Sequence, residues 1–226
     1  MTRFDAISID LDDTLWPIAP VIERAERALH EWLMDNCPRI ALNGAGHLGT
    51  IRKRILRRYP ERTHDFAFLR KAGLQLLLEQ AGYDVELVET AYRVFFEARN
   101  EVEVYADVIP ALESLSERFV LLAVTNGNAD LDRIGLAELF DHHVRAADVG
   151  AAKPDAEIFV AAARAAGVAP ERVLHVGDAP LEDIDGAHRA GMQAVWLNRF
   201  GRSWPDEHEP PMAEIQGLHE LHSLVV

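Results

Sequence analysis

The stretch Phe4-Asp5-Ala6-Ile7-Ser8-Ile9-Asp10-Leu11-Asp12-Asp13-Thr14-Leu15-Trp16 decides the fold and locates a candidate site. Its first six residues are mostly apolar and too few for a stable helix, so we predict a buried β-strand. Ligands bind at the carboxyl ends of strands in open α/β sheets, which is where Asp10 and Asp12 fall. Crowded carboxylates repel each other, and Mg²⁺, which prefers oxygen ligands, would relieve that repulsion. An Asp-rich turn is the alternative interpretation.

The composition limits the classes of partner. The chain has 226 residues with 23 Lys plus Arg against 37 Asp plus Glu, a net charge of −14. This excess argues against a general nucleic-acid binder or a binder of anionic membranes. Cys37 is the single cysteine, which fits a reducing compartment. The N-terminus shows no signal peptide, and the longest apolar stretches, such as 119–124, fall well short of the roughly 18 residues that span a membrane. We therefore predict a cytoplasmic protein.

Periodicity divides the chain into two parts. Helical spacing recurs from about 21–36 through 47–58, 65–81 and 84–101, and no strand pattern appears between Trp16 and Val104. Strands and helices then alternate, with strands expected at 119–124, 143–146, 172–176 and 193–197 and helices at 129–139, 155–166 and 181–190. The alternation predicts an α/β fold with a doubly wound parallel, Rossmann-like sheet. We assign residues 1–15 and 105–226 to this core and 16–104 to an all-helical cap domain, and we expect the segment 204–211 to be an ordered surface loop.

Further polar residues follow the later strands. Thr125 and Asn126 end the strand at 119–124 and are suited to bind an oxyanion or a phosphate. Lys153, placed before a helix whose first turn holds Pro154, is a compact cation suited to phosphoryl oxygens or to a carboxylate cluster. Asp178 and Asp183 offer a metal carboxylate and a partner for Lys153. Each pattern has an alternative interpretation: Thr125 and Asn126 as part of a turn, Lys153 as a solvated surface lysine, and Asp183 as a helix N-cap. The joint occurrence of these patterns, each closing an apolar strand, favours a functional site.

Together these residues resemble the four motifs of the haloacid dehalogenase superfamily of hydrolases, as Asp10-Leu-Asp12-Asp13-Thr14, Thr125-Asn126, Lys153, and Gly177-Asp178 with Asp183. The resemblance covers essentially the whole chain, and the helical insertion after the first strand is similar to that superfamily's cap. It implies an aspartyl-phosphate mechanism in which Asp10 attacks phosphorus and Asp12 protonates the leaving alcohol and then activates water. Thr125 would bind the phosphoryl group and Lys153 would steady it. Asp10, Asp178 and the main-chain carbonyl of Asp12 would hold Mg²⁺, with Asp183 assisting.

The resemblance also bears on the substrate. The dehalogenases of the superfamily lack an acid two residues after the nucleophile, so Asp12 favours phosphate esters of small metabolites. Thr14-Leu15-Trp16, Ala123–Asn128 and His175–Asp178 look like a bacterial branch of flavin mononucleotide phosphatases, some of which are thought to act on 5-amino-6-(5-phosphoribitylamino)uracil. A phosphosugar mutase and a non-catalytic phosphate-binding regulatory domain are the alternatives. The oligomeric state is not readable from the sequence.

Three further features of the sequence bear on its organisation and function. Between Ile51 and Lys71 stand eight basic residues against two acidic ones, a local charge of +6 that is either a solvated helix face or a patch that attracts an anionic substrate. We predict that Trp16 lies at the hinge between cap and core and contacts substrate at the entrance. We expect His175 to be a hydrogen-bonded core histidine.

Overall fold

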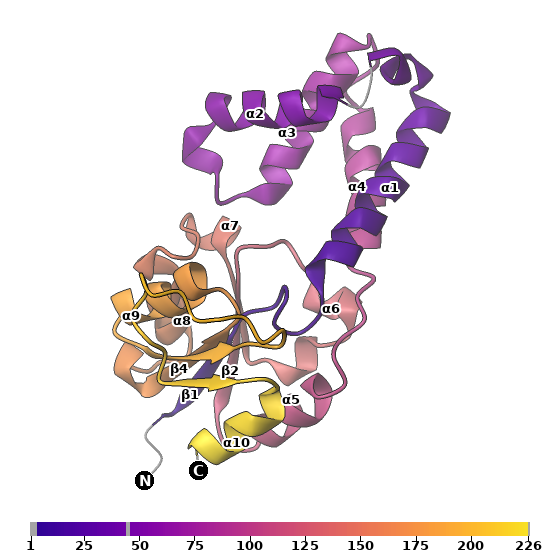
Figure 1. Cartoon of the computed structure of the whole chain (residues 1–226). Helices are drawn as coiled ribbons and strands as arrows, with labels where there is room; N and C mark the ends of the chain where they lie inside the picture. Colours follow the sequence, from indigo (N-terminus) through magenta and orange to yellow (C-terminus); the bar gives the residue numbers. More distant parts are fainter. Residues whose placement is uncertain (1–3, 44–45, 226) are drawn as a thin grey trace. The chain divides into compact units, whose positions relative to one another are not determined.

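The computed structural model describes residues 4–43 and 46–225, and the chain divides into two compact units. Met1–Pro17 with Glu103–Val226 forms what we call the α/β unit, and Ile18–Val102 forms the helical unit (Figure 1). Each boundary lies two residues from the one expected from periodicity. Residues 1–3 and 226, which the sequence assigns to the core, lie outside the described residues.

A parallel sheet organises the α/β unit. Its described strands lie in the order β3-β2-β1-β4-β5-β6, and every pairing is parallel. The strands are β1 (Ala6–Ile9), β2 (Val120–Thr125), β3 (His142–Arg145), β4 (Val173–Gly177), β5 (Gln193–Leu197) and β6 (Ala213–Ile215). The doubly wound α/β prediction is confirmed. Because the chain runs outward from β1 in one direction through β2 and β3 and in the other from β4, the order reverses between β1 and β4. Such a reversal is where open α/β sheets bind ligands.

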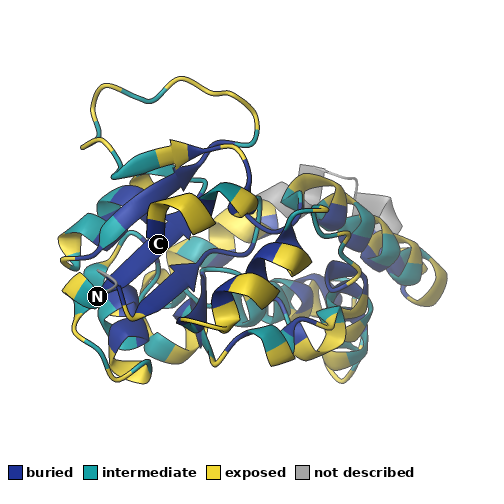
Figure 2. Cartoon of the chain, turned by 90° about the horizontal axis from the view of Figure 1, so that it is seen from below, coloured by how far each residue is buried: buried dark blue, intermediate teal, exposed yellow. Residues whose placement is uncertain are grey.

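Helices flank this sheet. They are α5 (Val108–Ser116), α6 (Leu131–Ile134), α7 (Ala146–Val149), α8 (Ala156–Ala165), α9 (Gly186–Arg189) and α10 (Leu221–Val225). Helix α8 packs on β2 and β3 and against α9, and α5 also contacts β2 (Figure 1). The central strands carry almost only buried residues (Figure 2). A sheet buried in this way reads in sequence as continuous apolar runs, which is why its strands were predictable.

Several local predictions were wrong. The helix expected at 129–139 is broken, because α6 ends at Gly135, whose φ of +83° no α-helix accepts, and a 3₁₀ turn, Ala137–Leu139, follows. The segment expected as one helix at 181–190 begins as a π-helical turn, Pro180–Asp185, before α9. Pro154 precedes α8 instead of lying in its first turn, since Asp155 is the N-cap and accepts from the Glu157 N–H. Elements α5, β6 and α10 were not predicted.

The helical unit contains no strand among its described residues, as predicted. Its α-helices are α1 (Ile18–Asn36), α2 (Gly46–Arg58), α3 (Phe66–Gln80) and α4 (Leu87–Arg99). Helix α1 packs along α4, and α3 packs on both α2 and α4. Their apolar faces form a core of their own that includes Leu29, Leu33, Leu77 and Phe95. No helix in the described part of the chain is long and apolar enough to cross a membrane.

Candidate active site

Asp10 stands at the carboxyl end of β1, at the reversal of the sheet. Its backbone N–H donates to the Val176 carbonyl at 2.9 Å, which continues the pairing with β4. The chain then turns sharply: Asp13 has φ of +62°, a conformation that aspartate tolerates better than most residues. The turn closes with a 2.8 Å bond from the Asp13 N–H to the Trp16 carbonyl. The Asp-rich turn is therefore present, and it fixes Asp10 at the sheet edge.

Lys153 lies between two buried carboxylates. Its Nζ is 2.5 Å from Asp10 Oδ1 and 2.6 Å from Asp183 Oδ1. The second Asp10 oxygen, Oδ2, accepts from the Thr14 hydroxyl at 3.3 Å. Lys153 and Asp10 are each 6% exposed and Asp183 is fully buried, so these contacts are made almost without water. Charge-assisted hydrogen bonds are strongest in such surroundings.

The charges of this cluster shift its pKa values. Burial raises the pKa of Asp10 well above its usual range, although Lys153 opposes the rise. Burial would also raise the pKa of Asp183, but Lys153 and the hydrogen bond from His175 outweigh burial and hold that pKa below its usual range. The pKa of Lys153 is raised, because the two carboxylates outweigh its burial. A single cation thus serves two carboxylates.

Asp178 follows β4 and faces the same edge. Its main-chain carbonyl accepts from Trp196 Nε1 and from the Arg202 guanidinium, each at 2.8 Å. Arg202 also pairs with Asp178 Oδ2 at 3.0 Å. Burial and the neighbouring Asp183 raise the pKa of Asp178 to about 6, although Arg202 opposes the rise. No local pattern in the sequence marks Arg202, because its contact with Asp178 depends on how the loop after β5 returns to β4.

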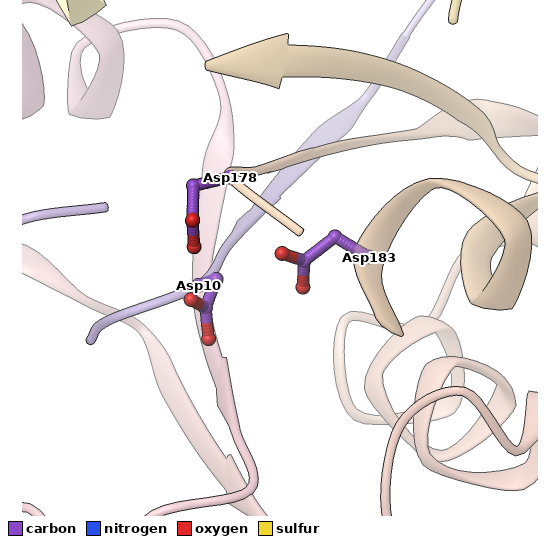
Figure 3. Close-up of side chains that lie close together, drawn as sticks. All are labelled: Asp10, Asp178 and Asp183. Atoms are coloured by element: carbon purple, nitrogen blue, oxygen red, sulfur yellow. The ribbon is translucent and has the colours of Figure 1, made fainter. Parts of the chain in front are cut away.

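Asp10, Asp178 and Asp183 converge (Figure 3). Each offers an oxygen, and these oxygens all lie within 4.8 Å of one another. Carboxylate oxygens are the ligands that Mg²⁺ prefers, and Lys153 and Arg202 together supply two positive charges against three carboxylates. The residues present therefore fit a hard divalent cation.

Asn126 has a role that the sequence did not indicate. Its side-chain nitrogen donates to the Lys153 carbonyl at 3.0 Å, and its oxygen accepts from the Lys153 N–H at 2.7 Å. This pair of bonds fixes the main chain that carries the lysine. The neighbouring Thr125 is buried, and its hydroxyl accepts from the Gly127 N–H at 2.9 Å. Contact of Thr125 and Asn126 with substrate stays a prediction.

Asp12 and Trp16 are paired with each other. Trp16 Nε1 donates to Asp12 Oδ1 at 2.9 Å, and the indole is fully buried while Asp12 is partly exposed. Trp16 is thereby placed to orient the Asp12 carboxylate. It lies two residues before Ile18, where the helical unit begins. The predicted contact of Trp16 with substrate stays a prediction.

His175 is a buried, hydrogen-bonded core residue, as expected. Its Nδ1 lies 2.8 Å from the Ser8 hydroxyl and its Nε2 lies 3.3 Å from Asp183 Oδ1. Burial lowers the pKa of the imidazole, against the opposing influence of Asp183. Ser8 was not singled out from the sequence, because nothing in a single sequence shows that it faces His175.

The parallel α/β sheet, with carboxylates and a lysine at its reversal, fits a hydrolase. A family model described as haloacid dehalogenase-like hydrolase matches residues 4–191, and the chain belongs to this family. The predictions of the superfamily and of its Rossmann-like core are confirmed.

Individual relatives have different activities in their names. The chain is 31% identical over 231 residues to the 5-amino-6-(5-phospho-D-ribitylamino)uracil phosphatase YigB of Escherichia coli, covering 99% of this chain and 97% of that protein. The crystal structure of a 2-haloacid dehalogenase from Pseudomonas syringae superposes with a TM-score of 0.94 at 41% identity, covering 98% and 97% of the two chains. The HAD-hydrolase YfnB from Bacillus subtilis, bound to magnesium, has a TM-score of 0.67 at 26% identity and covers 99% of each chain. The likeness to phosphatases supports the prediction of a phosphatase. Because a dehalogenase is also among the similar proteins, the comparisons do not identify the substrate.

Proposed function

We propose that this protein is a Mg²⁺-dependent phosphomonoester hydrolase that acts on a small phosphorylated metabolite through an aspartyl-phosphate. The observation that supports this most is Lys153 between Asp10 and Asp183, with Asp178 beside them, at the reversal of the sheet. Phosphoryl transfer needs positioning and charge neutralisation more than covalent participation, and this arrangement supplies both.

Asp10 is the proposed nucleophile. One of its oxygens forms a bond to phosphorus while the ester P–O bond breaks, and Asp12 gives its proton to the departing alkoxide. Asp12 then takes a proton from water, the hydroxide attacks phosphorus, and the P–O bond to Asp10 breaks. Splitting the displacement in this way replaces one difficult step by two easier ones. Trp16 holds the Asp12 carboxylate that performs both proton transfers.

The metal would be held by the carboxylates of Asp10 and Asp178 and by the main-chain carbonyl of Asp12. Bound Mg²⁺ supplies positive charge that neutralises the oxygens of the transferring phosphoryl group. Asp183 assists mainly through Lys153, because its Oδ1 already accepts from Lys153 and His175 and its Oδ2 from the Ala179 N–H at 2.9 Å. Thr125 and Asn126 would contact the phosphoryl group at the tip of β2.

The YigB likeness, which spans nearly the full length of both chains, supplies one substrate candidate, 5-amino-6-(5-phosphoribitylamino)uracil. The motifs that resemble flavin mononucleotide phosphatases supply the other candidate, flavin mononucleotide. The helical unit would act as the cap that contacts the leaving group, since the α/β unit provides the groups for phosphoryl transfer. Lids of this kind also exclude water during the reaction.

A second candidate function, hydrolysis of a 2-haloacid, is favoured by the likeness to the Pseudomonas syringae structure. Both reactions would use Asp10 as nucleophile. A halide, however, is the anion of a strong acid and leaves without a proton, so Asp12 would have no acid function in that reaction. A dehalogenase would also gain little from a cation beside Asp178. We therefore rank the phosphatase first.

The test is to assay the purified protein with p-nitrophenyl phosphate and a panel of phosphorylated metabolites, with Mg²⁺ and with EDTA. Chloride release from 2-chloropropionate is measured in parallel. The proposal predicts phosphate release that requires Mg²⁺ and no chloride release. Chloride release that persists in EDTA, without phosphate release, would establish the second candidate. A protein without turnover of any substrate would favour the non-catalytic alternative, and phosphate moved between positions of a sugar would favour the mutase.

A further inference from the structure

A continuous chain of hydrogen bonds leads through the core to Asp10, the proposed nucleophile. It runs from Ser8 to His175, from His175 to Asp183, from Asp183 to Lys153, and from Lys153 to Asp10. Ser8 and Asp10 are two residues apart on the extended chain of β1, so their side chains share a face. His175 is the register partner of Ser8 on β4. The sheet therefore brings both ends of the chain to one face, and nothing in the proposed chemistry yet uses Ser8 or His175.

The donors and acceptors of this chain can be assigned. Both oxygens of Asp183 act as acceptors, Oδ1 from the Lys153 ammonium and Oδ2 from the Ala179 N–H, so Asp183 has no hydrogen to give to His175. His175 Nε2 must therefore carry the hydrogen that it shares with Asp183 Oδ1. Burial favours the neutral imidazole, so Nδ1 has no hydrogen and accepts from the Ser8 hydroxyl. Each side chain thus has one defined direction of donation.

The contacts of His175 are of two kinds, apolar packing of its ring and hydrogen bonds of its two nitrogens. The imidazole is fully buried and meets the Phe159 ring edge to face, with centroids 4.9 Å apart. A phenyl ring would make comparable apolar contacts at this position. The contribution specific to histidine is the N–H that holds one oxygen of Asp183 while Lys153 and the Ala179 N–H hold the carboxylate from other sides.

We propose that His175 is a positioning residue, which keeps the Asp183 carboxylate turned toward Lys153 so that the lysine is shared between Asp183 and Asp10. This inference rests on the proposed function. Without the Nε2–H, Asp183 Oδ1 loses a donor and the carboxylate is less constrained, so Lys153 no longer holds Asp10 in one orientation. Because the groups that bind the phosphoryl moiety are unchanged, the loss falls on kcat and not on KM.

The first experiment compares three replacements. His175→Gln places an N–H close to the position of Nε2, His175→Asn places one near Nδ1 and within reach of Ser8, and His175→Phe keeps a ring without a donor. We expect Phe and Asn to lower kcat about 10–100-fold with KM nearly unchanged, the scale found when a residue that supports an active-site ligand is replaced. Gln should recover most of the loss. Melting temperatures measured alongside show which variants are folded.

The outcomes separate the possibilities. A folded Phe variant with wild-type kcat overturns the inference, as does a loss that is equal in Gln, Asn and Phe, which would mark His175 as a packing residue. If Phe does not fold, the comparison of Gln with Asn decides in the same way. A wild-type protein that releases no phosphate overturns the proposed function and, with it, the catalytic part of this inference.

A second measurement needs no turnover. In ¹⁵N-labelled metal-free protein, the imidazole resonances of His175, assigned by their loss in His175→Gln, should show a protonated Nε2, slow exchange of its hydrogen and an unprotonated Nδ1. A hydrogen on Nδ1 with Nε2 bare would overturn the inference, since Asp183 would then receive nothing from the imidazole.

Discussion

Lys153 forms ion pairs with two buried carboxylates of the site. Its ammonium group is almost inaccessible to water and makes short contacts with Asp10 and Asp183. Breaking a buried ion pair from one side leaves an uncompensated charge, which is strongly destabilising. Lys153 therefore holds the buried carboxylates of Asp10 and Asp183 together.

Asp12 is the residue that distinguishes the two candidate functions. Asp12→Asn keeps the size of the side chain and the acceptor for the Trp16 N–H but removes the acid. We expect phosphate release from alkyl esters to slow by roughly 10²–10⁴-fold, the usual range for general acid–base catalysis. Single-turnover kinetics with an alkyl phosphate and with p-nitrophenyl phosphate provide the check. The first step should slow much less with the nitrophenolate, which leaves without a proton. An equal loss with both leaving groups would argue against Asp12 as the acid.

Asp178 should make the effect of Mg²⁺ depend on pH. Its folded-state pKa of about 6 lies above its ordinary value of 3.8, because burial and Asp183 raise it. Without metal, the protonated form stabilises the fold; that contribution is complete below the ordinary pKa and is lost as the pH rises through about 6. Mg²⁺ requires the ionised form, so the rise in melting temperature caused by Mg²⁺ should be largest above this pKa and shrink as the pH falls through it.

The measurement is thermal unfolding with and without Mg²⁺ between about pH 5 and about pH 8, a range that brackets the shifted carboxylate. Asp178→Asn is the control, and it should show a small Mg²⁺ effect that does not vary with pH. A Mg²⁺-induced rise in the wild type that is constant across the range would contradict the assignment of Asp178 as a metal ligand.

A residue of the site was predictable when the sequence immediately around it marks its position. Asp10, Lys153 and Asp178 each follow an apolar strand or precede a helix, so local sequence marks them. Arg202 and His175 act on partners 24 and 8 residues away. The Arg202 contact exists only once β5 lies beside β4, and the His175 contact only once the turn Pro180–Asp185 has folded back over β4. A single sequence does not show which side chains then meet.

At the scale of elements, β4 requires glycine at its last position. A Cβ on Gly177 would lie 2.2 Å from Asp183 Cγ, so the carboxylate occupies the space that a side chain would need. Asp183 reaches this position because the turn Pro180–Asp185 is a π-helical one, which places Asp183 back over the strand end. The spacing between Asp178 and Asp183 is therefore a packing requirement as well as a chemical one.

Gly177→Ala should displace Asp183. We expect a loss of roughly 1–3 kcal/mol in the free energy of unfolding, the usual effect of overpacking, together with a lower kcat. Urea unfolding and the phosphatase assay check both. The matched control is Gly73→Ala in α3, where the new methyl would meet Ile51 at an ordinary 3.6 Å, and a gain of about 0.5–1 kcal/mol is expected. A Gly177→Ala protein as stable and active as the wild type would refute the packing argument.

The elements that the sequence predicted well are those with long periodic patterns. Helices α1, α3 and α4 and the central strands fall into this group, because burial of one face or of both dictates the residue pattern. The break in the helix after β2 was not predicted, because periodicity alone does not show that Gly135 takes a positive φ and ends α6. Short elements such as β6, with three residues, are too brief for periodicity to identify them.

At the scale of the whole molecule, the charge of the helical unit is distributed unevenly. Among the basic residues between Ile51 and Lys71, Arg62, Arg70 and Lys71 form ion pairs with Asp65, Glu26 and Glu89. The exposed ones lie along α2, and they are Arg52, Lys53, Arg54, Arg57 and Arg58. The patch expected from the sequence is therefore smaller than its local charge suggests, and α2 carries the exposed part of it.

Neutralising Arg57 and Arg58 to Gln should lower kcat/KM for a multiply charged phosphate ester at low salt and leave kcat nearly unchanged. Exposed charges change association rates and salt dependence and leave the chemical step unaffected. Steady-state kinetics at about 10 mM ionic strength, where screening is weak, provide the measurement. Arg27→Gln with Arg93→Gln removes the same charge from exposed positions on α1 and α4 and serves as the control. An equal loss in both pairs, or no loss in either, would rule out a specific role for α2.

The division into two units was predictable because helical periodicity without strands fills the region between two strand patterns. The substrate was not predictable, because under the proposed function the leaving group would be recognised by side chains of the helical unit, and the sequence pattern of that unit indicates only how its helices pack. The candidate site residues were easier to predict than the substrate, because most of them directly follow strands that the sequence pattern identifies.

The most direct test of the account is the location of the phosphoryl group during turnover. Wild-type protein is mixed with Mg²⁺ and p-nitrophenyl phosphate, quenched in acid within one turnover, digested, and examined by mass spectrometry, with Asp10→Asn treated in parallel. The account predicts one added phosphoryl group on the peptide that contains Asp10, placed on Asp10 by fragmentation, and at least about a 10³-fold loss of turnover in Asp10→Asn. A phosphoryl group on another residue, or sustained phosphate release by Asp10→Asn with deamidation excluded, would contradict it.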